Sequence, residues 1–201
     1  MTLIRRLSKA LVGAVCIGAC NLPVLADGHE VASKVCRSCH GATGNEIKRI
    51  YPRLAGMNEA YTRKQLYDYL DGRRTDPLMD LALPTFKASD VPGIAAYYAS
   101  QVPTAGKVLE PKMVAHGKKL YEEGNPASGL PNCQGCHGDK AQGVGDKYPR
   151  LAHQQQRYFT LQMTNYRKGV RSNDRAHAMR DIAALMTESE VAAVAEYLAG
   201  L

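Results

Sequence analysis

Apolar residues recur at the spacing of an amphipathic helix in several parts of the chain. Ile94 and Tyr98 lie four residues apart in one apolar stripe, and Val194 and Leu198 belong to a second stripe of the same kind. No run of alternating apolar and polar residues is long enough to indicate a strand. The pattern therefore predicts an all-α protein, with helices over residues 29–39, 58–71, 90–101, 112–123, 154–168 and 188–199.

Several of these helices carry sequence signals at their ends. Asn58 is predicted to cap the N-terminus of the second helix, and Gly72 to end it. Gly169 ends the corresponding helix in the second half of the chain in the same way. Thr187 and Glu190, three residues further on, form the sequence of a capping box. These signals support the predicted helix boundaries.

The chain contains an internal repeat. The segment 51–55, Tyr-Pro-Arg-Leu-Ala, returns unchanged at 148–152, a displacement of 97 residues. The same displacement aligns Tyr61 with Tyr158, Gln65 with Gln162, Tyr69 with Tyr166 and Arg74 with Arg171, and a displacement of 100 aligns Met79 with Met179. Such a duplication indicates two similar modules. We place the first module at 27–102, a Pro- and Gly-containing linker at 103–111, and the second module at 112–201.

The N-terminus has the pattern of a secretory signal peptide. Basic residues precede a short apolar run at 10–19, and Val24-Leu25-Ala26 supplies a small residue at the cut. We expect cleavage after Ala26, so that residues 1–26 are removed on export. An alternative cut is open, because Ile17-Gly18-Ala19-Cys20 is similar to a lipobox and would leave a lipid anchor on Cys20.

Each module contains the sequence Cys-x-x-Cys-His, formed in the first module by Cys36, Cys39 and His40. On a helical turn the positions i, i+3 and i+4 share one face, so two thiols and one imidazole point the same way. Two thiols at this spacing can bond to the two vinyl groups of one haem, and the histidine can then bind its iron. The second module repeats the motif with Cys133, Cys136 and His137. The sequence therefore predicts two covalently attached haem c groups.

Two other readings of a Cys-x-x-Cys pair were weighed. A zinc site would need both pairs to pool four thiolates and would leave both histidines without a purpose. A thioredoxin-like dithiol belongs beside a βαβ pattern, which the chain does not show. Cleavage after Ala26 removes Cys16 and Cys20, so all four remaining cysteines are used by the haem motifs.

The basic charge of the chain does not indicate a nucleic-acid partner. The net charge is +7, and removal of Arg5, Arg6 and Lys9 with the signal peptide reduces it to +4. Four haem propionates would lower it further. No basic stripe interleaved with aromatic residues is present, so we expect no binding to nucleic acid.

The axial ligand opposite each histidine largely decides what a haem can do. The candidates are Met57, Met79, Met113, Met163, Met179, Met186, His29, His116, His153 and His177. Met79 and Met179 are the two methionines that coincide under the repeat, and we predict them as ligands. Met163 and Met186 align with Leu66 and Phe86, which indicates core positions, and His177 is the main competitor in the second module.

The repeated Tyr-Pro-Arg-Leu segment predicts groups around the ligands. A ligating histidine normally donates its other N–H to a carbonyl. We expect the carbonyls of Pro52 and Pro149, each twelve residues after its histidine, to accept that bond. Arg53 and Arg150 could pair with haem propionates. The alternative is a repeated turn with a surface arginine.

Because each module has little apolar bulk, we also expect the haem-free chain to be unfolded or molten.

Together these residues resemble the cytochrome c4 family, which consists of exported dihaem proteins with two class I cytochrome c domains. The similarity extends over the whole mature chain. It implies two tandem class I domains related by pseudo-twofold symmetry, with His/Met ligation of both haems and propionate edges facing across the interface. It also implies electron transfer in the bacterial periplasm, often to a terminal oxidase.

The expected function is therefore that of an electron carrier and not of an enzyme. Its expected partners are redox proteins such as a terminal oxidase, a quinol-oxidising complex or a dehydrogenase. Two alternatives stay open. One is a dihaem cytochrome subunit of a dehydrogenase complex, such as a sulfide-oxidising flavocytochrome. The other is a dihaem peroxidase or thiosulfate dehydrogenase, which would need an open or unusually ligated iron.

Overall fold

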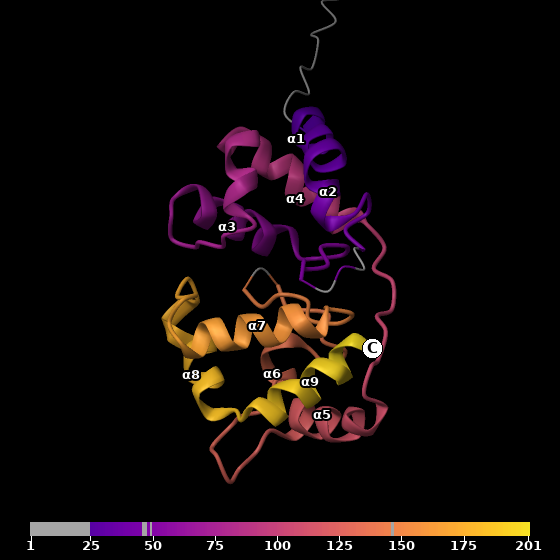
Figure 1. The fold of residues 1–201 in the computed structure, drawn as a ribbon, viewed down its shortest axis with the longest axis vertical. Helices are drawn as coiled ribbons and strands as arrows, with labels where there is room; N and C mark the ends of the chain where they lie inside the picture. Colours follow the sequence, from indigo (N-terminus) through magenta and orange to yellow (C-terminus); the bar gives the residue numbers. More distant parts are fainter. Residues whose placement is uncertain (1–24, 46–47, 49, 146) are drawn as a thin grey trace, which may run out of the picture.

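Two helical modules, stacked along the long axis of the molecule, make up the described part of the chain (Figure 1). The computed structural model describes residues 25–45, 48, 50–145 and 147–201. The first module contains α1 (Leu25–Val31), a π-helix (Ala32–Cys36), α2 (Arg37–His40), α3 (Glu59–Leu70), 3-10 helices at Asp80–Thr85 and Ala88–Asp90, and α4 (Val91–Ser100). The second contains α5 (Pro111–Glu123), α6 (Gln134–His137), α7 (Gln156–Arg167), a 3-10 helix at Arg175–His177, α8 (Ala178–Leu185) and α9 (Glu188–Ala199). Within the described ranges, β pairing is limited to two isolated bridges.

The all-α prediction is confirmed, and every predicted helix is present; α9 has the predicted bounds 188–199, and the ends of the others are shifted. The first helical stretch is longer than expected, because it begins at Leu25 and continues through the π-helix to His40. Helix α7 begins at Gln156, two residues later than predicted. Helix α8 was not predicted. The expected signal peptide and the alternative lipidation at Cys20 fall on 1–26, of which 1–24 lie outside the described residues.

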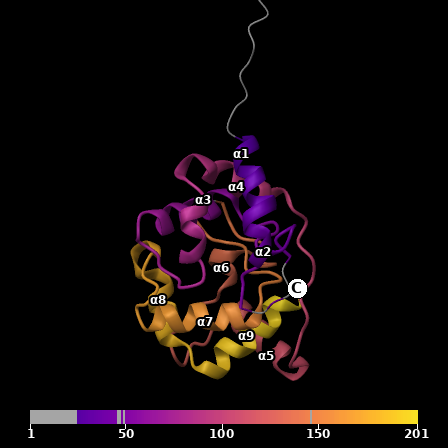
Figure 2. The ribbon, with the colours of Figure 1, turned by 45° about the horizontal axis from the view of Figure 1, so that its top comes forward.

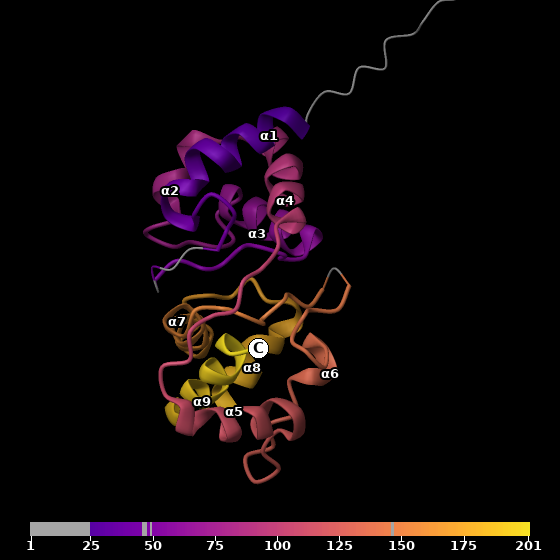
Figure 3. The same ribbon diagram turned by 90° about the vertical axis from the view of Figure 1, so that its right-hand side faces the viewer.

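The described helices are all too short or too polar to cross a membrane. An extended segment between α4 and α5 runs along one side of both modules, at the right in Figure 2 and in front in Figure 3. Its Gly106 N–H donates to the Ala199 carbonyl at 3.0 Å, and its Leu109 N–H donates to the Glu196 carboxylate at 2.8 Å. The segment is thus held against the end of α9.

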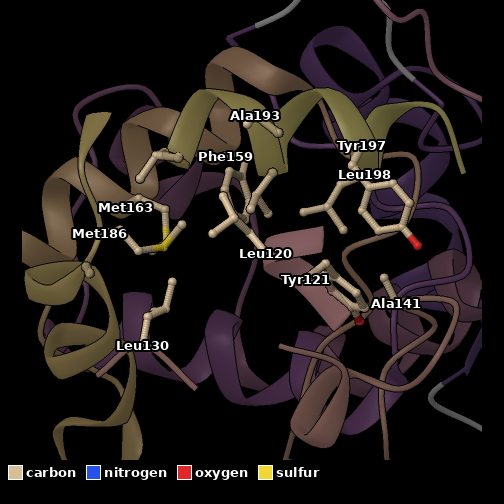
Figure 4. Packing of buried hydrophobic residues seen from close by; sticks show 14 of the residues in the cluster. Leu120, Tyr121, Leu130, Ala141, Phe159, Met163, Met186, Ala193, Tyr197 and Leu198 are labelled. Atoms are coloured by element: carbon tan, nitrogen blue, oxygen red, sulfur yellow. The ribbon is translucent and has the colours of Figure 1, made fainter. Parts of the chain in front are cut away.

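The second module has the larger apolar core (Figure 4). Helices α5 and α9 cross closely there, because a Cβ on Gly117 would lie 1.9 Å from the Ala193 carbonyl oxygen. Tyr121 on α5 and Leu198 on α9 are fully buried. Met163 and Met186 are also buried in this cluster, as the repeat predicted. The capping box of Thr187 and Glu190 at the start of α9 is confirmed.

The first module has a much smaller core of protein side chains. Its buried cluster consists of Ala32, Leu66, Phe86, Val91, Ile94 and Tyr98. Helices α1 and α4 approach at Gly28, where a Cβ would lie 2.4 Å from the Asp90 carbonyl oxygen. A contiguous cluster of six buried apolar residues is too small to order about 75 residues, given that ordering each residue costs about 1 to 2 kcal/mol.

Two arginines that the repeat aligns lie at the contact between the modules, where α3 faces α7 (Figure 1). Arg74 donates to the Tyr158 hydroxyl at 3.1 Å, and Arg171 donates to the Tyr61 hydroxyl at 2.9 Å. Both guanidinium groups are buried, and each also contacts an aromatic ring of its own module. Each module therefore makes to the other the contact that it receives, which is the pattern of a twofold interface.

Glutamine oxygens join the two halves of this contact. Gln65 Oε1 accepts from Arg74 at 2.6 Å and from Arg171 at 3.2 Å. Gln162 Oε1 accepts from Arg171 at 2.8 Å and from Arg74 at 3.3 Å. Asn173 links Gln65 to the buried carboxylate of Asp68. A network of mutually bonded, buried polar groups favours one fixed arrangement of the modules, because each lost bond leaves a buried group unsatisfied.

We expect Arg171→Lys to lower the free energy of unfolding by about 2 kcal/mol, because an ammonium group cannot reproduce the planar fork of donors. The ring contact with Tyr166 and the bonds to the first module would be weakened together. Urea denaturation measures the change. Arg157→Lys, at an exposed position of α7, is the matched control and should change stability by less than about 0.5 kcal/mol. Equal stability of the two variants would contradict the structural role of Arg171.

Candidate haem sites

Both Cys-x-x-Cys-His motifs lie on helical backbone, as their spacing requires. In the first module the π-helix ends at Cys36, and α2 carries the next four residues through His40. In the second module Cys133 precedes α6, and the His137 N–H donates to the Cys133 carbonyl at 2.9 Å. One helical turn therefore sets the two thiols and the imidazole of each motif on one face. The four cysteines that the structure describes, all of them in these motifs, have free thiols.

The surroundings of the thiols do not fit a redox dithiol. Burial raises the pKa of Cys36 and of Cys133 to about 11, whereas a reactive dithiol needs a thiol of lowered pKa. Within the described ranges, no three His, Cys, Asp or Glu side chains converge on a point that could hold a metal ion. The zinc reading therefore has no support from the arrangement of the side chains either.

The two motif histidines are held in the same way. His40 Nδ1 lies 3.1 Å from the Pro52 carbonyl oxygen, and His137 Nδ1 lies 2.9 Å from the Pro149 carbonyl oxygen. A carbonyl can only accept, so Nδ1 carries the hydrogen and Nε2 has the lone pair that can bind iron. Burial lowers the pKa of His137, which keeps the ring neutral, as a metal ligand must be. The geometry thus matches the arrangement expected around a haem-ligating histidine.

Met79 and Met179, the predicted axial ligands, are both partly buried and pack against the core of their own module. The Met79 segment is held by Asp76, whose carboxylate accepts from the N–H of Leu78 at 3.0 Å and of Met79 at 3.2 Å. Met79 directly precedes a 3-10 helix. The sulfur of each methionine thus belongs to an anchored segment, and its role as a ligand stays a prediction.

Met179 is the second residue of α8. The Asp174 carboxylate anchors this segment, because it accepts from Arg180 Nε at 2.8 Å and from the Arg180 N–H at 3.1 Å. His177, the competing candidate, is exposed and precedes α8 with a left-handed backbone, φ 61°. Its side chain is therefore less suited than Met179 to a buried haem face.

Arg53 and Arg150 both present a buried, unsatisfied donor. The Nε atom of each is buried and has no hydrogen-bond partner among the described residues. Burial also lowers the pKa of both guanidinium groups. An unsatisfied buried donor is costly, and a carboxylate is the acceptor that a guanidinium group binds best. The two arginines therefore fit haem propionates better than they fit the alternative of a surface turn.

His153 lies in the same region. The sequence marks it only as one of ten candidate axial ligands. The repeat aligns it with Gly56, and both positions have a left-handed backbone, with φ of 67° and 65°. A histidine in this conformation is uncommon. Its Nδ1 is buried and, within the described residues, has no partner, and burial together with Arg150 and Arg53 lowers its pKa. Within the described part of the chain, its Nδ1 is a third buried nitrogen without a partner, beside the Nε atoms of Arg53 and Arg150.

The residues present therefore fit a covalently held haem in each module. Each motif supplies two thiols and one histidine whose Nε2 has the lone pair that can bind iron. Each Pro-Arg-Leu segment supplies a carbonyl for that histidine and, for a propionate, a guanidinium group with a buried Nε. The small core of the first module is also suited to a large apolar group of this kind.

Comparison with known proteins agrees with this geometry. The cytochrome c family model matches residues 25–100 and again 114–201. Cytochrome c4 from Thiocapsa roseopersicina is 40% identical over 177 residues, which cover 87% of this chain and 91% of that protein. A thiosulfate dehydrogenase electron acceptor from Stutzerimonas stutzeri is 34% identical over 184 residues, covering 87% and 82%.

A solved structure is similar over the same extent. The crystal structure of reduced cytochrome c4 from Pseudomonas stutzeri superposes with a TM-score of 0.81 at 33% identity, and the match covers 89% of this chain and 98% of that chain. The duplicated family match, the two haem motifs and this likeness over both modules lead to one assignment: the chain belongs to the cytochrome c family as a two-domain member of the cytochrome c4 family, with two covalently attached haem c groups.

Proposed function

We propose that the protein carries single electrons at two haems in the bacterial periplasm, between a respiratory or dehydrogenase donor and an acceptor such as a terminal oxidase. The observation that carries the proposal is the twofold His–Pro arrangement, in which each motif histidine is bonded through Nδ1 to a proline carbonyl. In this proposal residues 1–26 direct export, and the modules 27–102 and 112–201 are joined by the linker 103–111.

Haem c, when bound, supplies a one-electron couple between ferric and ferrous iron. The residues of the chain would hold that iron from two sides, with His40 and Met79 in the first module and His137 and Met179 in the second. Six-coordination leaves no position for a substrate and little rearrangement when the valence changes. Arg53 and Arg150 would neutralise propionates at the seam. We therefore propose an electron carrier without an enzymatic activity of its own.

The spectrum of the ferric protein tests this proposal. Sulfur–iron bonding gives a weak band at about 695 nm, and we expect an amplitude that accounts for both haems. The ferrous protein should not take up carbon monoxide at either haem, and a redox titration should show two one-electron steps. Carbon monoxide binding at full occupancy, or a missing band at one haem, would instead support the enzyme alternative.

A narrower role is favoured by one relative. Because a thiosulfate dehydrogenase electron acceptor matches 87% of this chain, the donor could be an enzyme of that kind. Mixing the oxidised protein with a thiosulfate dehydrogenase and thiosulfate tests this, since the haem spectrum reports reduction directly. We expect rapid reduction at both haems if such an enzyme is the donor. A stable complex with a flavoprotein dehydrogenase would favour the subunit alternative instead.

A further inference from the structure

A side-chain amide of each module hydrogen-bonds the peptide group that orients the haem histidine of the other module. We propose that Gln154 and Asn58 are positioning residues that lower the reduction potential of the haem in the opposite module. The inference rests on the proposed histidine ligation. It concerns two residues whose sequence suggests only a helix start.

The first of these links begins at His40. Its Nδ1 donates to the Pro52 carbonyl at 3.1 Å, and the N–H at the other end of that same peptide group belongs to Arg53. The Arg53 N–H donates to Gln154 Oε1 of the second module at 2.9 Å. Gln154 Nε2 in turn donates to the Arg53 carbonyl at 3.1 Å. The Gln154 side chain is buried, so water does not compete with these bonds.

The second link runs in the opposite direction. His137 Nδ1 donates to the Pro149 carbonyl at 2.9 Å, and the N–H of that peptide group, on Arg150, donates to Asn58 Oδ1 of the first module at 2.8 Å. Asn58 Nδ2 donates to the Gly145 carbonyl at 3.0 Å. A Cβ on Gly143 would lie only 2.6 Å from Asn58 Oδ1, so the absence of a side chain on Gly143 makes room for the asparagine side chain.

The structure keeps these contacts at the expense of a helix cap. Asn58 was predicted to cap α3 with its side chain, and that prediction is wrong, because the side chain makes no capping bond and reaches into the other module. A lost cap costs about 1 kcal/mol. The two amides are also not equivalent in the repeat, which aligns Asn58 with Gln155 and not with Gln154. The same contact is thus reached from two different positions.

Electronic coupling within a peptide group gives the direction of the effect. When the Arg53 N–H donates to Gln154, conjugation draws negative charge toward the Pro52 carbonyl oxygen. A more negative carbonyl accepts more strongly from His40 Nδ1, and the imidazole becomes a stronger electron donor. A stronger donor favours ferric iron and lowers the potential. Gln154 therefore lowers the reduction potential of the first haem, and Asn58 lowers that of the second haem in the same way.

The test is a pair of variants whose effects appear in the opposite module. Gln154→Met keeps the length of the side chain and removes both of its hydrogen bonds to Arg53, and we expect the reduction potential of the first haem to rise. A threefold change in its ratio of reduced to oxidised form is expected, about 28 mV, since tenfold corresponds to 59 mV. The second haem should stay unchanged. Asn58→Leu should raise the reduction potential of the second haem alone. NMR of partly reduced samples follows each haem separately.

Three further measurements separate the relay from a loosened interface. Tyr158→Phe removes a bond to Arg74 without touching either peptide group, and it should move neither potential. Gln154→Glu provides a stronger hydrogen-bond acceptor, so it should lower the reduction potential of the first haem more than that of the second. This variant remains informative if Gln154→Met does not fold. The ¹⁵N shift of His40 Nδ1 should change in Gln154→Met and not in Tyr158→Phe.

Equal shifts of both haems in every variant, or no shift, would overturn the inference. The wild-type spectrum tells this failure apart from failure of the proposed function. If the sulfur–iron band is present at both haems and the crossed shifts are absent, the relay is wrong and the electron carrier stands. If the band is absent, His/Met ligation itself fails.

Discussion

Met179→Ala is expected to remove half of the band at about 695 nm and to let ferrous protein bind carbon monoxide at one haem of two. The variant removes the sulfur proposed to hold the second iron and leaves His137 with its Pro149 contact in place. The potential of that haem should fall by the order of 200 mV, within the range of about 0.8 V that axial ligands span. Met79→Ala should do the same at the first haem.

A second methionine of the same module supplies the control. Met186 is 5% exposed and lies in the core cluster, so Met186→Ala should cost about 2 to 5 kcal/mol of stability. It should leave the band and the potentials unchanged, because its sulfur holds no iron. Carbon monoxide binding to the second haem in His177→Ala, with none in Met179→Ala, would show that the ligand assignment is wrong.

Loss of the haems is expected to unfold the chain, with the larger effect in the first module. A chain with Cys36→Ser and Cys39→Ser should lose the ordered structure of α1 to α4, because the cluster of six buried apolar residues in that module is too small to hold it. Far-ultraviolet circular dichroism and amide hydrogen exchange measure the loss. A chain without either haem should show no cooperative urea transition.

The second module provides the comparison for this prediction. Its cluster of sixteen buried residues is larger, so Cys133→Ser with Cys136→Ser should leave residual helix with loose side-chain packing. Amide protection should therefore fall less in α5 and α9 than in α1 and α4 of the other variant. Native-like near-ultraviolet dichroism in a haem-free chain would contradict the prediction for both modules.

Much of the site could be predicted because its parts are close together along the chain. The Cys-x-x-Cys-His motif is complete within one helical turn, and the bond from His40 to Pro52 spans only twelve residues. Helix periodicity and the capping box at Thr187 are also local patterns. The repeat added the pairing of Met79 with Met179, which no single local pattern contains.

The contacts between the modules could not be predicted in this way. The bond from Arg53 to Gln154 joins residues 101 positions apart, and Asn58 meets Arg150 across 92. The repeat showed that Arg74 and Arg171 correspond, but not that each would reach the other module. Asn58 is the N-cap residue of α3, as predicted, but its side chain does not cap the helix, because it accepts instead from the partly buried Arg150 N–H of the other module.

The features that could be predicted from the sequence differ from those that needed the tertiary structure for a physical reason. The sequence by itself determined the helices, the two haem attachment sites and the duplication, since covalent spacing and helical periodicity act over a few residues. The tertiary structure alone decided which side of each module faces the other, and therefore which amide reaches which histidine's peptide group. Hydrogen bonds between distant segments depend on how the two modules pack, and packing is set by all the buried surfaces together.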